Sequence, residues 1–307
     1  MNPILALIIT NVIWGAASPV FKFALTNIPP FILGFLRFFG ASFLLLPFAV
    51  KNWKKMSLPD FGLILLGSFF AININIGFFF LGLQKTTSIN APIIASSQPI
   101  FLYIFAIIFL KEKMHKKVFH GLLIALIGVI IIIVSPLLLD GGISLGAKEG
   151  ALEGNLYLVI ATLGAVINAL IFKKVLRRVN MWQVTFISFV FGALLFIPVM
   201  LPEFATWSFA DLNSNGWVGI IYGVVFSSAI AYGLFNYGIS KITAQEVGIF
   251  AYIDPVVAVA VAIPLIHEYP TPAFYIGTFF VFLGIFIAEG RVHYHPLHRI
   301  WRWKVVK

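Results

Sequence analysis

The sequence contains no cysteine among its 307 residues, and only 10% of its side chains are charged. The lack of cysteine excludes disulfides and thiolate metal sites. Soluble domains carry about 25% charged residues, so this chain has too few to cover a water-exposed surface. With 61% hydrophobic residues and 33 phenylalanines, it cannot be a soluble enzyme, a secreted disulfide scaffold or a disordered protein.

Motifs for hydrolytic, nucleotide-driven and metal chemistry are also missing. The chain has no GxxxxGK[ST] phosphate loop, no GxSxG turn and no HExxH pair, and no two aspartates face each other within an apolar segment. We therefore expect no enzyme activity, no catalytic residue, no cofactor and no metal site.

Long apolar segments run through the whole chain. About 20 apolar residues are needed to cross about 30 Å of hydrocarbon. Segments free of Asp, Glu, Lys and Arg are 61–84, 86–110, 118–139, 154–172, 179–202 and 212–240, and further apolar segments cover 3–25, 31–50, 244–266 and 273–289. They lack the alternation of membrane β-strands. We predict an all-α integral membrane protein with ten transmembrane helices, the first of them retained rather than cleaved as a signal.

The basic residues gather in alternate loops. Seventeen of the 21 Lys and Arg residues lie on one predicted side: Lys51, Lys54, Lys55, Lys111, Lys113, Lys116, Lys117, Lys173, Lys174, Arg177, Arg178, Lys241, Arg291, Arg299, Arg302, Lys304 and Lys307. Short basic loops face the cytoplasm. We therefore place both termini in the cytoplasm and the chain in the plasma (inner) membrane. The net charge of +10 follows from this topology, so no nucleic-acid partner is expected.

The sequence matches itself when it is shifted by 156 residues. In that register Gly67, Gly77, Gly82, Lys85, Thr87, Ala95, Pro99, Glu112, Gly121 and Gly128 meet Gly223, Gly233, Gly238, Lys241, Thr243, Ala251, Pro255, Glu268, Gly277 and Gly284. Because each copy has five predicted helices, an odd number, the second copy enters the membrane from the opposite side. Inverted repeats are typical of secondary transporters, which bind their solute near mid-membrane between the repeats.

The repeat sets the predicted domain boundaries. The first five-helix repeat covers 1–136 and an outer connecting loop covers 137–153. The second five-helix repeat covers 154–290, and a basic cytoplasmic tail covers 291–307.

Several motifs resemble those of the drug/metabolite transporter superfamily, specifically its EamA-type permeases. The residues that carry the resemblance are Trp14-Gly15, Lys22, Pro30, Arg37-Phe38, Pro99, Lys111-Glu112-Lys113, Gly121, Gly128, Asp254-Pro255, Glu268, Gly277 and Gly284. The resemblance covers nearly the whole chain and implies ten helices and the transport of small metabolites, often export. It does not identify the solute.

Asp254 is the most informative candidate, because it lies about 15 Å along its predicted helix, near mid-bilayer. In a functional role, it titrates as a proton site or holds a substrate amine. In a structural role, its carboxyl caps a backbone group freed by Pro255. Its repeat mate is Gln98, which is polar but does not titrate.

Lys22 and Arg37 lie in the outer halves of the first two predicted helices. They either extend to the outer headgroups or line an outward vestibule that attracts a carboxylate or phosphate. Glu112 and Glu268 end predicted helices, where the helix dipole disfavours anions. They are either structural corners, compensated by the start of the next helix, or gate residues.

The paired irregular helices around Pro99 and Pro255 mark the predicted binding cavity. Serines or Gln98 near the first proline would satisfy carbonyls that it frees. The predicted cavity residues are Trp14, Asn73, Ser96, Gln98, Tyr103, Asn168, Tyr232, Asn236, Tyr252 and Asp254. Each polar member has an alternative role as a hydrogen bond between helices.

The leading functional hypothesis is a secondary transporter that moves a small organic metabolite, an amino acid or similar, by alternating access, with export favoured. A flippase for a lipid-linked metabolite is the alternative, with Lys22 and Arg37 as phosphate ligands. Expected partners are the solute, membrane lipids and, as an option, a second copy of the chain.

Overall fold

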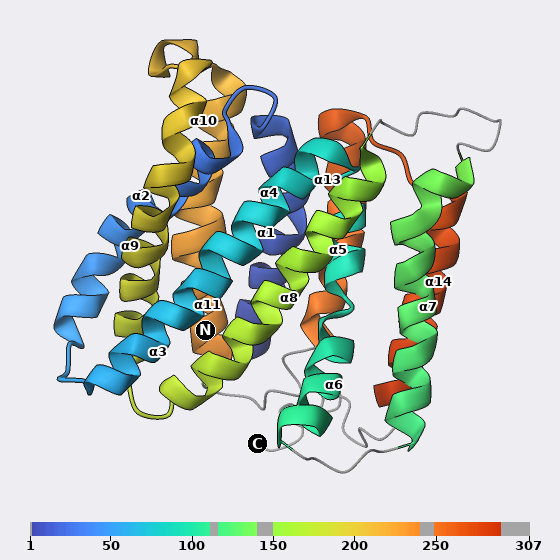
Figure 1. The fold of residues 1–307 in the computed structure, drawn as a ribbon, viewed down its shortest axis with the longest axis horizontal. Helices are drawn as coiled ribbons and strands as arrows, with labels where there is room; N and C mark the ends of the chain where they lie inside the picture. The colour runs from blue at the N-terminus through green and yellow to red at the C-terminus, as the bar shows by residue number, and fades with distance from the viewer. Residues whose placement is uncertain (1, 111–115, 140–149, 240–248, 290–307) are drawn as a thin grey trace, which may run out of the picture.

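The computed structural model describes residues 2–110, 116–139, 150–239 and 249–289, and every regular element in these ranges is helical (Figure 1). The first half contains α1 (Pro3–Ala24), α2 (Pro30–Lys51), α3 (Leu58–Ser68), the π-helix η1 (Phe69–Ile74), α4 (Asn75–Lys85), α5 (Asn90–Ala95), α6 (Gln98–Leu110) and α7 (Lys116–Leu139). The second half contains α8 (Ala151–Val175), α9 (Met181–Met200), the 3₁₀ turns η2 (Leu201–Ala205) and η3 (Phe209–Asp211), α10 (Ser214–Ile221), the π-helix η4 (Tyr222–Ile230), α11 (Ala231–Ile239), the 3₁₀ turn η5 (Ile249–Tyr252), α13 (Ile253–Ile266) and α14 (Pro272–Glu289).

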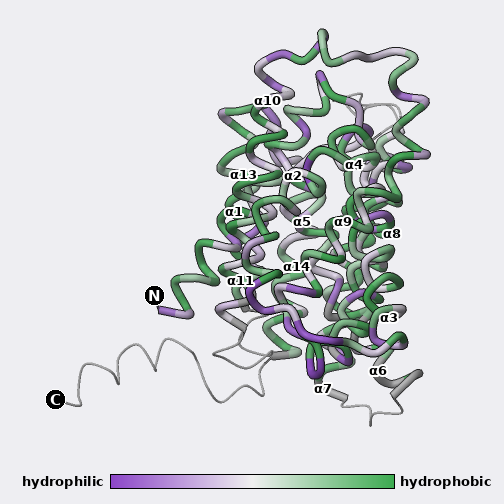
Figure 2. Tube along the Cα trace, turned by 90° about the vertical axis from the view of Figure 1, so that its left-hand side faces the viewer, coloured by the Kyte–Doolittle hydropathy of each residue, from purple (hydrophilic) through white to green (hydrophobic). Residues whose placement is uncertain are grey.

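The helices have the length and apolar surface of membrane spans. Within the described residues, seven are long and apolar enough to cross a membrane: Pro3–Ala24, Pro30–Lys51, Leu58–Lys85, Val118–Leu137, Ala151–Phe172, Met181–Ala205 and Ser214–Phe235. Phe250–Ile266 and Pro272–Ala288 are shorter apolar helices. Phe43, Phe279 and Phe286 are exposed, and Figure 2 shows hydrophobic residues along most of the length of the helices. The all-helical, multi-pass architecture is as predicted, whereas the count of ten crossings stays a prediction.

The segment 86–110, predicted as one helix, is divided into α5 and α6. The hydroxyl of Ser96 donates to the carbonyl of Pro92 at 2.9 Å, and that of Ser97 donates to the carbonyl of Ile94 at 2.6 Å. Both carbonyls also accept backbone N–H groups, from Ser96 and Ser97, so the bond predicted to a carbonyl freed by Pro99 stays a prediction. Under the 156-residue shift this break corresponds to 252–253, where η5 gives way to α13, so both halves carry the irregularity.

A π-helix interrupts the third helix of each half at equivalent positions. Shifting Phe69–Ile74 of η1 by 156 residues gives 225–230, which lies within η4. Short π segments inside α-helices occur frequently at functional sites, because they widen the helix locally and redirect its side chains. The segment in the second half is the one that carries the serines of the interior site described below.

The last helices of the two halves, α7 and α14, pack against each other at one side of the bundle (Figure 1). A Cβ built on Gly121 would lie 2.5 Å from the carbonyl oxygen of Gly284, and one on Gly128 would lie 2.4 Å from that of Gly277. The earlier glycine of α7 thus meets the later glycine of α14. These equivalent helices run in opposite directions, as the predicted inversion requires.

The other helices of the two halves are interleaved rather than segregated. Helix α1 packs against α13 and α11, while α2 packs against α9 and η4. The backbone N–H groups of Phe31 and Ile32, at the start of α2, donate to the carboxylate of Glu203 at 3.1 and 2.8 Å. This carboxylate caps the helix N-terminus and ties the region after α9 to it. Side chains from both halves therefore meet in the bundle interior.

Candidate functional site

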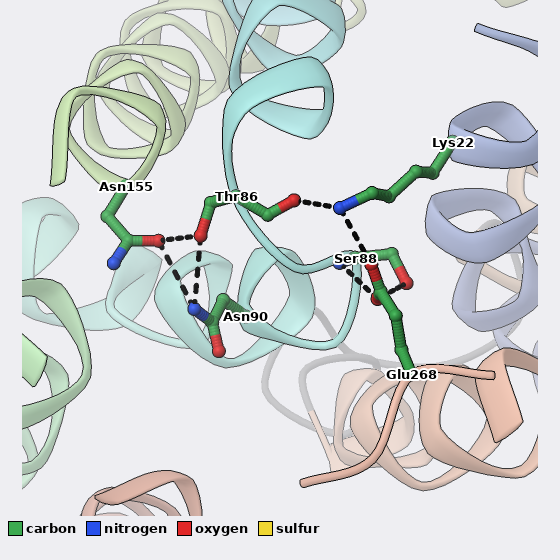
Figure 3. A network of polar contacts seen from close by, with 6 residues as sticks. All are labelled: Lys22, Thr86, Ser88, Asn90, Asn155 and Glu268. Carbon is green, nitrogen blue, oxygen red and sulfur yellow. Dashed lines mark hydrogen bonds and ion pairs between the residues drawn. The ribbon is translucent and has the colours of Figure 1, made fainter. Parts of the chain in front are cut away.

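An ion pair connects the two halves at one end of the bundle (Figure 3). Lys22 Nζ, in the last turn of α1, lies 2.6 Å from Glu268 Oε1, just beyond α13, and both side chains are about seven-eighths buried (14% and 13% exposed). Lys22 Nζ also donates to the backbone carbonyl of Thr86. The second oxygen of Glu268 accepts from the backbone N–H and the hydroxyl of Ser88 at 2.7 and 2.6 Å.

A second layer of hydrogen bonds holds this ion pair in place (Figure 3). The hydroxyl of Thr86 donates to Asn155 Oδ1 at 2.7 Å, and the side-chain amide of Asn90 donates to the same oxygen at 3.2 Å. Asn155 Nδ2 in turn donates to the carbonyls of Ile132 and Ile133 in α7. Because Thr86, Asn90 and Asn155 are buried, these bonds form in a low-dielectric setting. We refer to Lys22, Thr86, Ser88, Asn90, Asn155 and Glu268 as the end cluster.

The negative charge of Glu268 is offset by different groups from those that the sequence suggested. The simplest sequence interpretation was that the start of the next helix compensates its charge. Its hydrogen-bond partners are instead Lys22 and Ser88 from the first half of the chain. His267, the residue before it, adopts a left-handed backbone with φ of 54°, which ends α13 and turns the chain. Glu112 lies outside the described residues.

Arg37 lies in the bundle interior, with only 3% of its surface exposed. Its Nε donates to the hydroxyl of Ser228 and its Nη2 to that of Ser227, both at 3.0 Å. The guanidinium carbon lies 4.8 Å from the ring centroids of both Phe21 and Phe38. Arg37 thus neither extends to the headgroups nor lines an open vestibule in this conformation. It bridges α2 and η4.

Trp14 and Tyr232, two predicted cavity residues, lie next to these serines. The indole N–H of Trp14 donates to the backbone carbonyl of Ser227 at 3.1 Å. The ring of Tyr232 lies 5.5 Å from that of Trp14 and 5.2 Å from that of Phe189. Aromatic side chains from α1, α9 and α11 therefore form one wall beside Arg37.

Asp254 lies in the first turn of α13 and packs against α1. A Cβ built on Gly15 would lie 2.8 Å from both the Cα and the carbonyl oxygen of Asp254, so only glycine allows this approach. Asp254 Oδ1 is buried and has no hydrogen-bond donor in the described part of the chain. A bond to a backbone group freed by Pro255 is likewise absent there, so capping does not explain this carboxyl.

Tyr222 contacts residues that surround both Arg37 and Asp254. Its hydroxyl donates to the carbonyl of Ile13. Ile13 directly precedes Trp14 and Gly15, the glycine that packs against Asp254. The ring of Tyr222 lies 5.9 Å from that of Phe21, the same ring that the guanidinium of Arg37 covers. We refer to Trp14, Arg37, Tyr222, Ser227, Ser228, Tyr232 and Asp254 as the interior site, to which α1 and α2 contribute from the first half and η4, α11 and α13 from the second.

The other predicted cavity residues that the structure describes have different surroundings. Asn73 donates to the carbonyl of Gly192 at 3.0 Å, which is the alternative helix–helix role. Ser96 bonds within its own helix, and the ring of Tyr252 packs against that of Phe282 at 5.9 Å. Asn168 Oδ1 is buried without a donor among the described residues, Gln98 is half-buried, and Tyr103 packs against the hydrophobic core. The side chain of Asn236 lies outside the described residues.

Two residues of the interior site were overlooked in the sequence analysis. Ser228 and Tyr222 had no assigned role. The available signal was two adjacent serines within an otherwise apolar segment, a pairing that close packing alone does not require.

Comparisons with known proteins agree with this architecture. The model of the EamA-like transporter family matches residues 1–134 and 152–289. The uncharacterized transporter YetK of Bacillus subtilis (strain 168) is 29% identical over 292 residues, which cover 94% of this chain and 87% of that protein. The uncharacterized transporter sll0355 of Synechocystis sp. is 26% identical, over 94% of this chain and 89% of that one. A crystal structure that is 17% identical superposes with a TM-score of 0.63 over 92% of this chain and 95% of its own, which shows a shared fold alone.

Proposed function

Because the chain belongs to the EamA-like transporter family, we propose that it is a secondary transporter that exports a small organic metabolite, an amino acid or similar, across the plasma membrane. The observation that carries this proposal is the interior site. Arg37 and Asp254 are ionisable groups held among apolar helices, and both halves of the chain contribute to their surroundings. Charges at such depth are costly and by default mark a solute or ion pathway.

Alternating access supplies the mechanism of this proposal. The repeats 1–136 and 154–290 rock about the interior site, which each conformation opens to one side. The end cluster supports this view, because its ion pair joins the two repeats and must separate when that end opens. The topology predicted from the sequence puts 17 of the 21 basic residues on the cytoplasmic side, so we assign the end cluster to the outer side and both termini to the cytoplasm.

Asp254 is the proposed coupling residue. Its buried Oδ1 has no donor among the described residues and needs one, which is either a proton or the ammonium of a zwitterionic solute. Its repeat mate Gln98 does not titrate, so the coupling belongs to one repeat alone. The phosphate loop that ATP-driven transport requires is missing from the sequence, so the driving force in this proposal is a solute or proton gradient.

Release from proteoliposomes tests the proposal. Vesicles are preloaded with mixed amino acids, nucleosides and sugars, and their contents are followed with and without a pH gradient. We expect selective loss of one class, accelerated by the gradient, and no loss from protein-free vesicles. Folded protein that releases no solute would overturn the proposal. In that case scrambling of a fluorescent phospholipid would favour the flippase alternative.

A further inference from the structure

Arg37 has no carboxylate counter-ion among the residues that the structure describes. The described ion pairs are Lys22–Glu268, Lys85–Glu153 and Arg178–Asp60, and all of them lie near helix ends. A guanidinium stays charged in proteins, so its burial carries a desolvation penalty that two hydroxyls and two aromatic rings offset only in part. The guanidinium of Arg37 is therefore a buried charge that no described carboxylate pairs with directly.

Arg37 and its two serine partners have more hydrogen-bond donors than the described residues have acceptors for them. Two of the five guanidinium N–H groups donate to Ser227 and Ser228, and no described residue accepts from the other three. Each serine accepts from Arg37, so its own O–H is left to donate, and neither has an acceptor within the described ranges. Three N–H groups of Arg37 and two O–H groups of its serine partners thus lack an acceptor among the described residues. Such an arrangement lacks an anion.

A carboxylate fits this arrangement better than a phosphate does. The planar guanidinium fork binds the two oxygens of a carboxylate in parallel, and the charges of one Arg and one carboxylate cancel. A phosphate dianion would leave a net negative charge in the apolar interior. Gly223 leaves room for the Arg37 side chain, because a Cβ at this position would lie 3.1 Å from Arg37 Cγ.

We infer that Arg37, with the hydroxyls of Ser227 and Ser228, binds the carboxylate of the transported solute and sets the specificity for carboxylated over decarboxylated metabolites. This inference rests on the proposed function, since the near-complete burial of Arg37 requires that the transport cycle open the site. The interior site then has two ionisable groups with different roles: Arg37, from α2, takes the carboxylate, and Asp254, in the first turn of α13, remains the proposed coupling residue.

The test uses three probes that share one side chain. L-Leucine is a zwitterion, 3-methylbutylamine lacks the carboxylate, and 4-methylpentanoate lacks the amine. Their binding is measured on purified full-length protein in nanodiscs by the shift in melting temperature, with inorganic phosphate as a fourth probe. The same series is built on any other amino acid that the proteoliposome assay identifies.

We expect the wild-type protein to bind the carboxylated probes at least roughly tenfold more tightly than the amine, the discrimination that a charge-assisted hydrogen bond supplies. Arg37→Gln should bring this ratio to within about threefold, and the double variant Ser227→Ala/Ser228→Ala should reduce it in part. Arg37→Lys restores the charge without the fork and should give an intermediate ratio. Lys51→Gln, an exposed cation on the same helix, is the matched control and should leave the ratio unchanged.

The ratio of carboxylate to amine binding separates a binding role of Arg37 from a structural one. A purely structural Arg37 would lower the melting temperature of the variants without changing the ratio of carboxylate to amine binding, and that result overturns the inference. If Arg37→Gln does not fold, the serine double variant and Arg37→Lys decide by the same ratio. Stronger binding of phosphate than of any carboxylate would overturn the carboxylate assignment. Carboxylate binding that depends on Arg37, in protein that transports nothing, would sustain the site while refuting the proposed function.

Discussion

Lys22 Nζ and Glu268 Oε1 lie 2.6 Å apart, although 246 residues separate them in the sequence, and they join the two halves of the chain at one end of the bundle. Every side-chain or backbone donor to Glu268 within the described residues comes from the first half of the chain. The ion pair therefore stabilises one arrangement of the two repeats, and breaking it has consequences for both stability and access.

Glu268→Gln should destabilise the folded protein by roughly 2 kcal/mol, because it removes a charge from a largely buried, hydrogen-bonded pair. Thermal unfolding in detergent measures this change. Glu153→Gln provides the control at an exposed ion pair, since Lys85 and Glu153 are 40% and 46% exposed, and its effect should be much smaller. Equal losses in the two variants would contradict a special role for Lys22–Glu268.

The same substitution should open the outer end. Ser18 lies one helical turn before Lys22 on the same face of α1 and is buried without a partner for its hydroxyl in the described structure. Because the chain has no cysteine, Ser18→Cys creates a single labelling site. We expect a membrane-impermeant maleimide to label it several-fold faster in the Glu268→Gln background. An unchanged rate would mean that the ion pair does not limit access.

Asp254→Asn should abolish the acceleration of transport by a pH gradient while solute exchange continues, because the amide can donate and accept hydrogen bonds but carries no exchangeable charge. Initial rates in proteoliposomes across a pH series measure this. Asp211→Asn is the control: hydrogen bonds from the backbone N–H and the hydroxyl of Ser208 hold the pKa of Asp211 below its usual range. Asp211 therefore stays ionised near neutral pH and cannot supply the coupling. Wild-type rates and pH dependence in Asp254→Asn would refute coupling at this residue.

The glycine contacts between α7 and α14 predict a sharp difference between two Gly→Ala variants. A Cβ on Gly128 would meet backbone atoms of α14, 2.4 Å from the carbonyl oxygen of Gly277, so Gly128→Ala should cost about 1–3 kcal/mol of stability. Gly62, in α3, has nothing within 4 Å of a built Cβ, so Gly62→Ala should gain about 0.5–1 kcal/mol. Melting temperatures compare the two. An unchanged melting temperature in Gly128→Ala would show that α7 and α14 separate readily.

Single cysteines also test the orientation in the membrane. Thr206→Cys, in the exposed turn after η2, should react with an impermeant maleimide in intact cells. Lys54→Cys, in the basic segment after α2, should react only after permeabilisation. The reverse pattern would place the end cluster on the cytoplasmic side.

The periodic features of this chain were predictable because they depend on local chemistry. Apolar segments of span length must form helices in lipid, since only a helix satisfies its own backbone there. The glycines repeated at 156 residues predicted two equivalent, inverted halves, and the antiparallel contacts of Gly121 with Gly284 and Gly128 with Gly277 agree. The irregular fourth helix was likewise visible from its prolines and serines.

Which ionisable groups meet could not be predicted in this way. From the sequence, Lys22 and Arg37 were two similar cations in neighbouring outer half-helices. The fold separates their roles: Lys22 pairs with a carboxylate from the other half, whereas Arg37 is buried against serines 190 and 191 residues later in the chain.

The sequence alone thus determined the helical membrane class, the repeat and the family resemblance, because each follows from hydrophobic length, charge in loops and residue spacing. Only the tertiary structure decided that Lys22 pairs with a carboxylate and that Arg37 pairs with none among the described residues. That outcome depends on how α1 and α2 pack against η4 and α13, and the packing of surfaces far apart in sequence leaves no local pattern to read.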